Sequence, residues 1–279
     1  PGALLDRLRP IAWFPPMWAF LCGWVSAGPG TAPTAWALLA GIALTGPLVC
    51  GASQIVNDWF DKDVDALNEP HRPIPSGRVP GNTALHFAVI WTVIAQIWAL
   101  MLGAWVAAAT CLGLLLAWAY SAPPLRLKLN GWWGNSAVAL SYEGLAWITG
   151  AAIVLGGKLP PSPILMIALL YSIGAHGIMT LNDFKSVHGD LRMGIRSLPA
   201  QLGREKAAKV ACVFMLIPQL CVVALLLHWQ LVLCAVAVSS SVLAQLLAMR
   251  RLLSDPERLA PWYNATGVSL YVAGMMAAA

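Results

Sequence analysis

Four aspartates stand close together directly after a long apolar run: Asp58, Asp61, Asp63 and Asp65. If the apolar helix continues through them, Asp58, Asp61 and Asp65 share one helix face, and Asp63 points elsewhere. Like charges so close together repel one another unless cations bind between them. Carboxylate oxygens at a helix end, with basic residues just beyond, suit Mg²⁺ and a diphosphate. The alternative interpretation is a solvated run of charges in a loop.

A second acidic motif repeats the pattern of the first at an offset of 125 residues. In each motif an Asn-Asp pair precedes an aromatic residue, and another Asp stands seven positions after the first; the residues are Asn57, Asp58 and Asp65, then Asn182, Asp183 and Asp190. Two independent charge runs would not share these features. The repetition predicts two parallel repeats whose acidic helix ends face each other.

A basic segment lies between the two motifs, from Tyr120 through Pro123 and Pro124 to Lys128. The two prolines stop the preceding helix, and Arg126 and Lys128 project on the same side if the segment is extended. Together with the carboxylates they could bind cations and an anion. The alternative is that both residues only anchor the loop on the positively charged side of a membrane.

The composition identifies an integral membrane protein. Hydrophobic residues make up 59% of the chain and charged residues 10%, and the mean hydropathy is +0.70; a soluble domain would have about 25% charged residues. Apolar runs near the length of about 20 residues that crosses a bilayer predict nine helices, near 11–28, 34–56, 83–101, 103–120, 136–156, 162–182, 207–227, 229–249 and 262–279. The predicted fold is all-α, a single domain over 1–279, with repeats at about 11–120 and 136–249 and a last helix at about 262–279.

Positive charge predicts the orientation. With nine spans, Lys158 alone of the 17 Lys and Arg residues falls on one side, and the positively charged side faces the cytoplasm. The N-terminus and both acidic motifs are therefore expected in the cytoplasm and the C-terminus on the opposite side. Basic loops near anionic lipid headgroups account for the net charge of +5, so no nucleic acid is needed to explain it.

The motifs resemble those of the UbiA-type membrane prenyltransferases. The pattern Asn57-Asp58-x-x-Asp61-x-x-x-Asp65 looks like their first aspartate-rich motif, and the second cluster looks like the other half of their diphosphate and metal site. Further stretches resemble the chlorophyll synthase branch, above all the enzymes that make bacteriochlorophyll: residues 13–18, 68–78, 182–187 and 260–268. One position departs, because His188 stands where the family pattern leads us to expect Glu.

The resemblance implies a polyprenyl transferase that esterifies the propionate of bacteriochlorophyllide a with geranylgeranyl or phytyl diphosphate and releases diphosphate. Mg²⁺, or another divalent cation, would be bound by Asp58, Asp61, Asp65, Asp183 and Asp190. The diphosphate would be bound by Asn57, Arg72, Tyr120, Arg126, Lys128, Asn182 and Lys185. The resemblance also implies a bacterial inner, intracytoplasmic membrane, contact with membrane lipids, and association with other pigment-synthesis or photosynthetic assembly proteins.

Two titratable residues inside predicted spans are candidates for a pigment pocket. Glu143 is the one acidic residue deep in a span, where ionisable groups are functional candidates; a neutral packing residue is the alternative. His176 lies seven residues before Asp183 on the same helix face. It could ligate or hydrogen-bond a chlorin, or it could be a buried, hydrogen-bonded histidine.

Three other functions compete with this one. A related enzyme could prenylate an aromatic quinone precursor, but an aromatic ring must lose a proton after the attack, whereas a propionate is already ionised at neutral pH and needs no base. A membrane transporter would carry its polar groups near the bilayer midplane. A pigment-assembly subunit would not need a duplicated aspartate motif.

Overall fold

The structure, a computed structural model, describes residues 10–29, 35–68, 71, 74, 76–79 and 82–279. Within these ranges all regular secondary structure is helical, apart from one isolated parallel bridge between Asn130 and Arg196. The predicted all-α class is therefore confirmed. The chain forms two compact units, Pro1–Arg126 with Leu145–Pro160 and Leu127–Gly144 with Pro161–Ala279.

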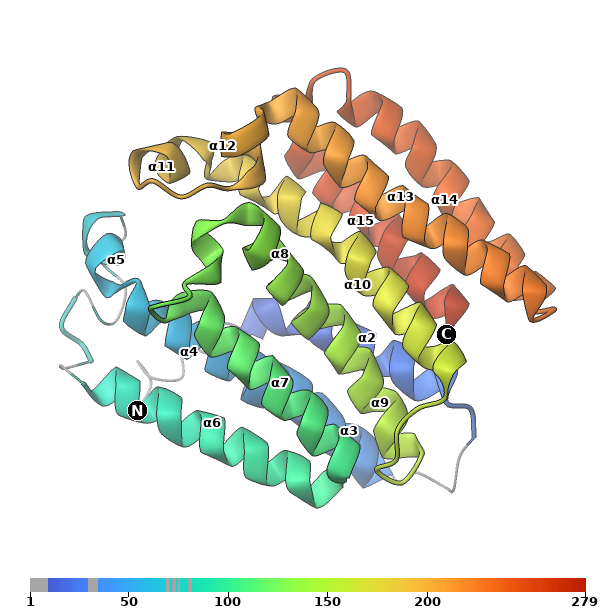
Figure 1. The fold of residues 1–279 in the computed structure, drawn as a ribbon, viewed down its shortest axis with the longest axis horizontal. Coiled ribbons are helices and arrows are strands. Elements are labelled where there is room, and N and C mark those ends of the chain that lie inside the picture. Colours follow the sequence, from blue (N-terminus) through green and yellow to red (C-terminus); the bar gives the residue numbers. More distant parts are fainter. Residues whose placement is uncertain (1–9, 30–34, 69–70, 72–73, 75, 80–81) are drawn as a thin grey trace. The chain divides into compact units, whose positions relative to one another are not determined.

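The first unit is built around the helix that carries the first acidic motif. This helix consists of α3 (Ala35–Ala43), a π-helical turn (Leu44–Cys50) and α4 (Gly51–Phe60), and the short α5 (Lys62–Asn68) follows it. In Figure 1, α4 runs beside α6 (Thr83–Leu102) and α7 (Ala104–Ser121), and α4 packs against both. The packed α4 thus holds the start of the acidic motif in a fixed position.

A second helix pair completes the first unit. α2 (Phe14–Ser26) packs against α9 (Ala146–Val154). Gly23 and Gly150 allow the two backbones to approach, because a Cβ at either position would collide with the backbone of the other helix. Phe20, Leu44 and Val106 lie in the apolar core that joins these helices to the rest of the unit.

Gly103 separates α6 from α7, next to the break between the predicted helices 83–101 and 103–120. Its φ of 137° lies in a region that L side chains rarely adopt. The backbone also passes close to Gly157, where an added Cβ would lie 2.7 Å from the Cα of Gly103. The two glycines allow this contact between the α6–α7 turn and the segment that follows α9.

The second unit is a helical bundle around α10 (Ser162–Asn182). α10 packs against α8 (Gly131–Ala139), α13 (Arg204–His228) and α15 (Pro256–Ala278), and α14 (Val232–Leu252) packs against α13 and α15 (Figure 1). The short α11 (Val187–Arg192) and α12 (Leu198–Leu202) connect α10 to α13. The second acidic motif therefore begins at the end of the central helix of this bundle.

Buried polar contacts join the helices of this bundle. The Tyr271 hydroxyl donates to the Tyr171 backbone carbonyl at 2.7 Å. Gln219 and Gln245 exchange two side-chain hydrogen bonds, at 3.1 and 3.0 Å, between α13 and α14. Such interhelical hydrogen bonds stabilise helix association where the surroundings are apolar.

Seven helices of the described chain are long and apolar enough to cross a membrane, judged by length and composition: Ala35–Phe60, Thr83–Leu102, Ala104–Ser121, Gly131–Val154, Ser162–Lys185, Arg204–His228 and Val232–Leu252. The predicted first and last spans correspond to α2, which has only 13 residues, and α15, which has 23. Neither belongs to the seven, so the predicted count of nine is not confirmed. Exposed apolar residues such as Met101 and Leu233 suit a lipid environment. The chain is a multi-pass membrane protein.

The helix predicted at 136–156 is divided between the two units. It runs from Gly131 to Val154, with a π-helical turn at Leu140–Leu145 between α8 and α9. Its first half belongs to the second unit, and its second half packs on α2 in the first. The compact units thus do not coincide with the predicted repeats, and the division of the sequence into repeats stays a prediction.

Candidate functional site

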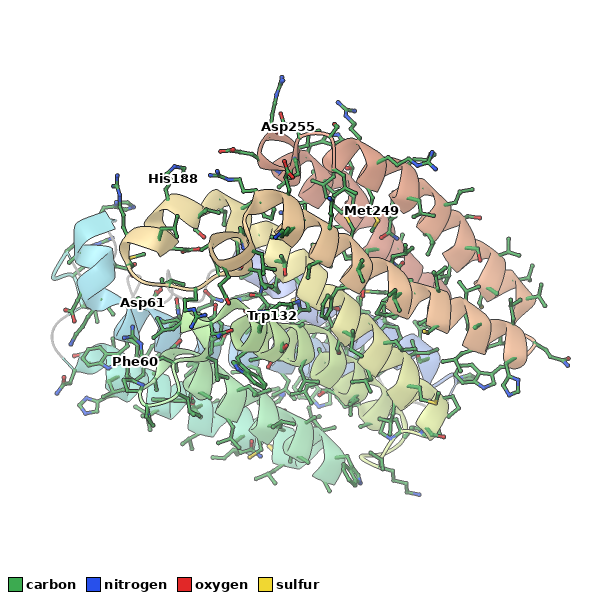
Figure 2. The ribbon with its side chains drawn as sticks, turned by 45° about the horizontal axis from the view of Figure 1, so that its top comes forward. Phe60, Asp61, Trp132, His188, Met249 and Asp255 are labelled. Carbon is green, nitrogen blue, oxygen red and sulfur yellow. The ribbon has the colours of Figure 1, made fainter. Side chains whose placement is uncertain are left out.

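The first acidic motif lies at a bend and not on one uninterrupted helix. α4 ends at Phe60, Asp61 has φ −98° and ψ 2°, and α5 begins at Lys62. Helix-like hydrogen bonds flank the bend, because the Asp61 N–H donates to the Asn57 carbonyl at 2.9 Å and the Asp65 N–H to the Asp61 carbonyl at 2.7 Å. The assumption of a continuous helix is therefore wrong at Asp61, which Figure 2 labels at this bend.

Burial separates the four aspartates. Asp58 is 5% and Asp65 is 8% exposed, Asp61 is half-buried, and Asp63 is exposed. Asp63 thus differs from the other three, as the helical spacing predicts. A positive charge lies near the motif, since the Lys62 ammonium lies 4.1 Å from the centre of the Trp59 ring.

Asn57 links the first motif to the basic segment. Its Nδ2 donates to the Oγ of the fully buried Ser121, at 3.3 Å. Ser121 is the last residue of α7 and follows the half-buried Tyr120. Within the first unit, therefore, the first motif and the start of the basic segment lie together.

The second acidic motif also begins where a long helix ends. α10 ends at Asn182, Asp183–Lys185 form a 3-10 turn, and α11 carries Asp190, which is 6% exposed. The Ser186 hydroxyl lies 3.0 Å from Asp190 Oδ2. Lys185 is exposed. Both motifs thus consist of a helix end, a bend and a short helix whose later Asp is buried.

Two asparagines from other helices hold this second motif. Asn135 on α8 donates from Nδ2 to Asp183 Oδ2 at 3.1 Å. Asn264 on α15 donates from Nδ2 to Asn182 Oδ1 at 2.9 Å. Sequence reasoning gave neither residue a role in the site. Asn135 stands directly before the predicted span at 136–156, eight positions before Glu143, and Asn264 lies in one of the stretches that carry the family resemblance.

The basic segment is not extended, so that prediction is wrong. Arg126 has a φ of 39°, and Leu127–Leu129 form a 3-10 turn. The reason is the contact of the following residues with the segment after α11. The Gly131 N–H donates to the Arg196 carbonyl at 2.8 Å, and the Arg196 N–H donates to the Leu129 carbonyl at 2.9 Å.

The two basic side chains belong to different compact units. Arg126 belongs to the first unit, with the first acidic motif, whereas Lys128 belongs to the second unit, with the second motif. The Nε of Arg126 is buried and makes no hydrogen bond. Arg72, the remaining predicted diphosphate-binding residue, lies outside the described residues.

The two candidates for a pigment pocket are both buried. Glu143 is 6% exposed and lies in the π-helical turn, and its Oε2 makes no hydrogen bond. His176 packs against Trp132 and Phe214, with ring centroids 5.8 and 4.5 Å away, and these two rings also contact each other. The backbone of Trp132 approaches the imidazole, but neither ring nitrogen makes a hydrogen bond of normal geometry. This aromatic cluster favours a packing role for His176.

The carboxylates suit a cation that brings ligands of its own. Among the described residues, no three His, Cys, Asp or Glu side chains converge as a preformed metal site. Mg²⁺ is usually bound by one or two carboxylates together with water and substrate phosphates. The hydrogen bond from Asn135 also engages only one oxygen of Asp183. The donor set therefore fits Mg²⁺ that binds together with a diphosphate.

Comparison with known proteins identifies one family and two similar relatives. The UbiA prenyltransferase family matches the chain over residues 14–271. The chain is 55% identical to the bacteriochlorophyll synthase 33 kDa chain of Cereibacter sphaeroides, over 100% of this chain and 92% of that protein. It is 50% identical to the protein of the same name from Rhodobacter capsulatus, over 99% and 91%.

A solved structure shares the fold. The UbiA homologue from Archaeoglobus fulgidus bound to GPP and Mg²⁺ superposes with a TM-score of 0.78 at 20% identity, covering 99% of each chain.

Proposed function

The chain belongs to the UbiA prenyltransferase family, and from that premise we propose that it transfers a geranylgeranyl or phytyl group from its diphosphate to the propionate carboxylate of bacteriochlorophyllide a. This is the reaction expected of a bacteriochlorophyll synthase, the name of relatives that are 55% and 50% identical over nearly the whole chain. The observation that carries the proposal is the pair of Asn-Asp motifs at helix ends, each with a second, buried Asp seven positions on.

The acidic residues bind the cation in this proposal. Asp58, Asp61 and Asp65 in the first unit, and Asp183 and Asp190 in the second, are the carboxylates that would each contribute ligands to Mg²⁺ ions or other divalent cations. When bound, Mg²⁺ neutralises the charge that develops on the leaving diphosphate. The solved homologue with GPP and Mg²⁺ supports the use of a divalent metal in this family.

Neutral and basic residues bind the diphosphate oxygens. These residues are Asn57, Arg72, Tyr120, Arg126, Lys128, Asn182 and Lys185. Side-chain contacts of the described chain support two of them, since Asn57 is fixed by Ser121 and Asn182 by Asn264. Charge-assisted hydrogen bonds to phosphate are shorter and stronger than neutral ones, so the basic residues favour binding of the substrate and departure of diphosphate.

The reaction needs no proton transfer. The bond between the first prenyl carbon and the diphosphate oxygen breaks, and both electrons leave with diphosphate. A propionate oxygen then forms the new bond to that carbon. A side-chain carboxyl of this kind has a pKa of about 4.3 in water, so the propionate is ionised at neutral pH. The arrangement of acidic and basic residues without an evident general base is therefore sufficient for ester formation.

The same proposal includes the location of the protein. The N-terminus and the acidic motifs lie on the cytoplasmic side of the bacterial inner, intracytoplasmic membrane, because nearly all Lys and Arg residues fall on that side of the predicted spans. Both substrates carry long apolar or flat aromatic groups that dissolve in the bilayer. Association with other pigment-synthesis or photosynthetic assembly proteins would pass them on directly.

An assay with purified protein in detergent tests the function. Bacteriochlorophyllide a, geranylgeranyl diphosphate and Mg²⁺ should yield the pigment ester, and Asp58→Asn or Asp183→Asn should reduce the rate by about 100-fold or more. Wild-type rates in either variant would contradict the site assignment. A product from 4-hydroxybenzoate, with none from the chlorin, would instead assign the protein to the quinone branch.

A further inference from the structure

We propose that Asn135 on α8 is a positioning residue, which orients the Asp183 carboxylate for the cation that accompanies the diphosphate. This inference rests on the proposed function. Asn135 does not contact the reacting atoms in this role; it acts through Asp183. The residue is 8% exposed and lies 48 positions from Asp183 in the sequence.

The hydrogen bonds of Asn135 fix the orientation of its amide. Its Nδ2 lies 3.1 Å from Asp183 Oδ2 and 3.4 Å from the Oγ1 of Thr180. Thr180 donates its own hydroxyl hydrogen to the His176 carbonyl at 2.9 Å, so its oxygen is left to accept. The two amide hydrogens thus have two acceptors. Rotating the amide by 180° would turn its oxygen toward a carboxylate that only accepts.

α8 is itself held firmly in place. A Cβ at Gly131 would lie 2.6 Å from the Leu198 backbone nitrogen, and one at Gly134 would lie 3.1 Å from the Leu127 carbonyl oxygen. Only glycine permits such close backbone contact at Gly131. The start of the helix that carries Asn135 therefore packs directly against the segment that follows the second acidic motif, which favours a fixed distance between Asn135 and Asp183.

The hydrogen bond from Asn135 distinguishes the two carboxylate oxygens of Asp183. Oδ2 accepts from Asn135, and Oδ1 takes no part in that bond and can face a cation. Carboxylates that bind metals are themselves commonly hydrogen-bonded, and loss of such an outer partner typically weakens metal binding or activity about 10–100-fold. An Asp183 without Asn135 would rotate more freely and would bind the cation less tightly.

The test measures cation binding directly, without turnover. Mn²⁺ is titrated into the purified protein at a fixed concentration of inorganic pyrophosphate, and the protein-bound ion is obtained by electron paramagnetic resonance as the difference from the same titration without protein. Asn135→Ala should raise the Mn²⁺ dissociation constant about 10–100-fold. Thr180→Val, which removes the second acceptor, should raise it by less, and Thr180→Ser, which keeps the hydroxyl, should bind Mn²⁺ like the wild type.

Gln219→Leu is the matched control. It also removes a buried amide that hydrogen-bonds between helices of the same unit. It should lower the melting temperature and leave the Mn²⁺ affinity unchanged, because the lost contact joins α13 to α14 and not to the acidic motif. A loss of Mn²⁺ affinity in Gln219→Leu as large as in Asn135→Ala would mean that Asn135 acts only through stability.

The outcomes distinguish this inference from the proposed function. If the wild type binds no Mn²⁺ with pyrophosphate, the proposed function fails. If the wild type binds and folded Asn135→Ala binds within twofold of it, the proposed function stands and Asn135 is not a positioning residue. If Asn135→Ala does not fold, Thr180→Val decides, and unchanged Mn²⁺ affinity there overturns the inference.

A second readout separates positioning from general damage. In the esterification assay, the Mg²⁺ concentration for half-maximal rate should rise in Asn135→Ala, and excess Mg²⁺ should restore most of the rate. A variant with a merely loosened fold would lose rate at every Mg²⁺ concentration. A rate in Asn135→Ala that excess Mg²⁺ does not restore would also contradict the inference.

Discussion

The side-chain amide of Asn57 on α4 donates to the hydroxyl oxygen of Ser121, the last residue of α7, across 3.3 Å. The two residues are 64 positions apart, and their contact joins the first acidic motif to the start of the basic segment. The bond uses the amide nitrogen of Asn57, and the amide oxygen takes no part in it.

Ser121→Ala should weaken substrate binding by a small amount. A hydrogen bond between neutral groups contributes about 1 kcal/mol, which corresponds to a roughly fivefold rise in KM for the prenyl diphosphate. Ser53→Ala is the control, because the Ser53 hydroxyl donates to the Cys50 carbonyl within its own helical segment. Equal effects of the two substitutions in steady-state assays would argue against a role for the Asn57–Ser121 contact.

Asp65→Asn and Asp63→Asn should differ sharply, although both residues lie in α5. Asp65 is buried and assigned to the cation, so its neutralisation should lower kcat/KM about 100-fold. Asp63 is exposed, and its neutralisation should change kcat/KM by less than about twofold, as for most surface substitutions. Esterification rates at saturating Mg²⁺ provide the measurement, and a large loss in Asp63→Asn would show that the helical spacing misassigned the ligands.

His188→Glu should leave the activity nearly unchanged. The family pattern leads us to expect Glu here, yet His188 is exposed on α11 (Figure 2) and its Nδ1 lies 3.5 Å from Arg204, which also pairs with Glu257. A Glu would face the same arginine, and exposed ion pairs contribute about 0–1 kcal/mol. The rate should therefore stay within about twofold. A rise or fall of tenfold would mean that position 188 reaches the bound substrate.

Gly103→Ala should destabilise the fold, whereas Gly113→Ala should not. Gly103 has a φ of 137° and touches Gly157, and such a strained conformation costs an L residue about 1–3 kcal/mol before any clash is counted. Gly113 lies within α7, and a Cβ there would meet its nearest atoms at 3.7 and 3.8 Å, an ordinary contact. Thermal unfolding in detergent should show a lower melting temperature for Gly103→Ala alone. Equal melting temperatures would show that the α6–α7 turn can adjust.

Several features of this chain follow from local sequence. Hydropathy is a sum over neighbouring residues, so the membrane class and the positions of most spans can be predicted without any tertiary contact. The same is true of the break at Gly103, which separates two apolar runs, and of the two Asn-Asp motifs, whose residues are close in sequence. The family is expected from these motifs, and its reaction from these motifs together with the stretches at 13–18, 68–78 and 260–268.

Local patterns predicted the finer geometry less well. The bend at Asp61 and the 3-10 turn at Leu127–Leu129 both replaced a regular conformation expected from the sequence. The 3-10 turn follows from backbone contacts with Arg196, which is distant in the sequence. The periodicity of a segment cannot predict such a contact, because periodicity depends only on residues within that segment.

The sequence by itself determined which chemistry is available, because it contains carboxylates, amides and basic residues at spacings from which a site for a cation and a diphosphate can be proposed. Only the tertiary structure decided how those groups are held. Asn135 reaches Asp183, and Asn264 reaches Asn182, through the rotation and depth at which α8 and α15 pack against α10. That packing depends on glycines and apolar side chains of several helices at once, so it cannot be predicted from any single stretch of the sequence.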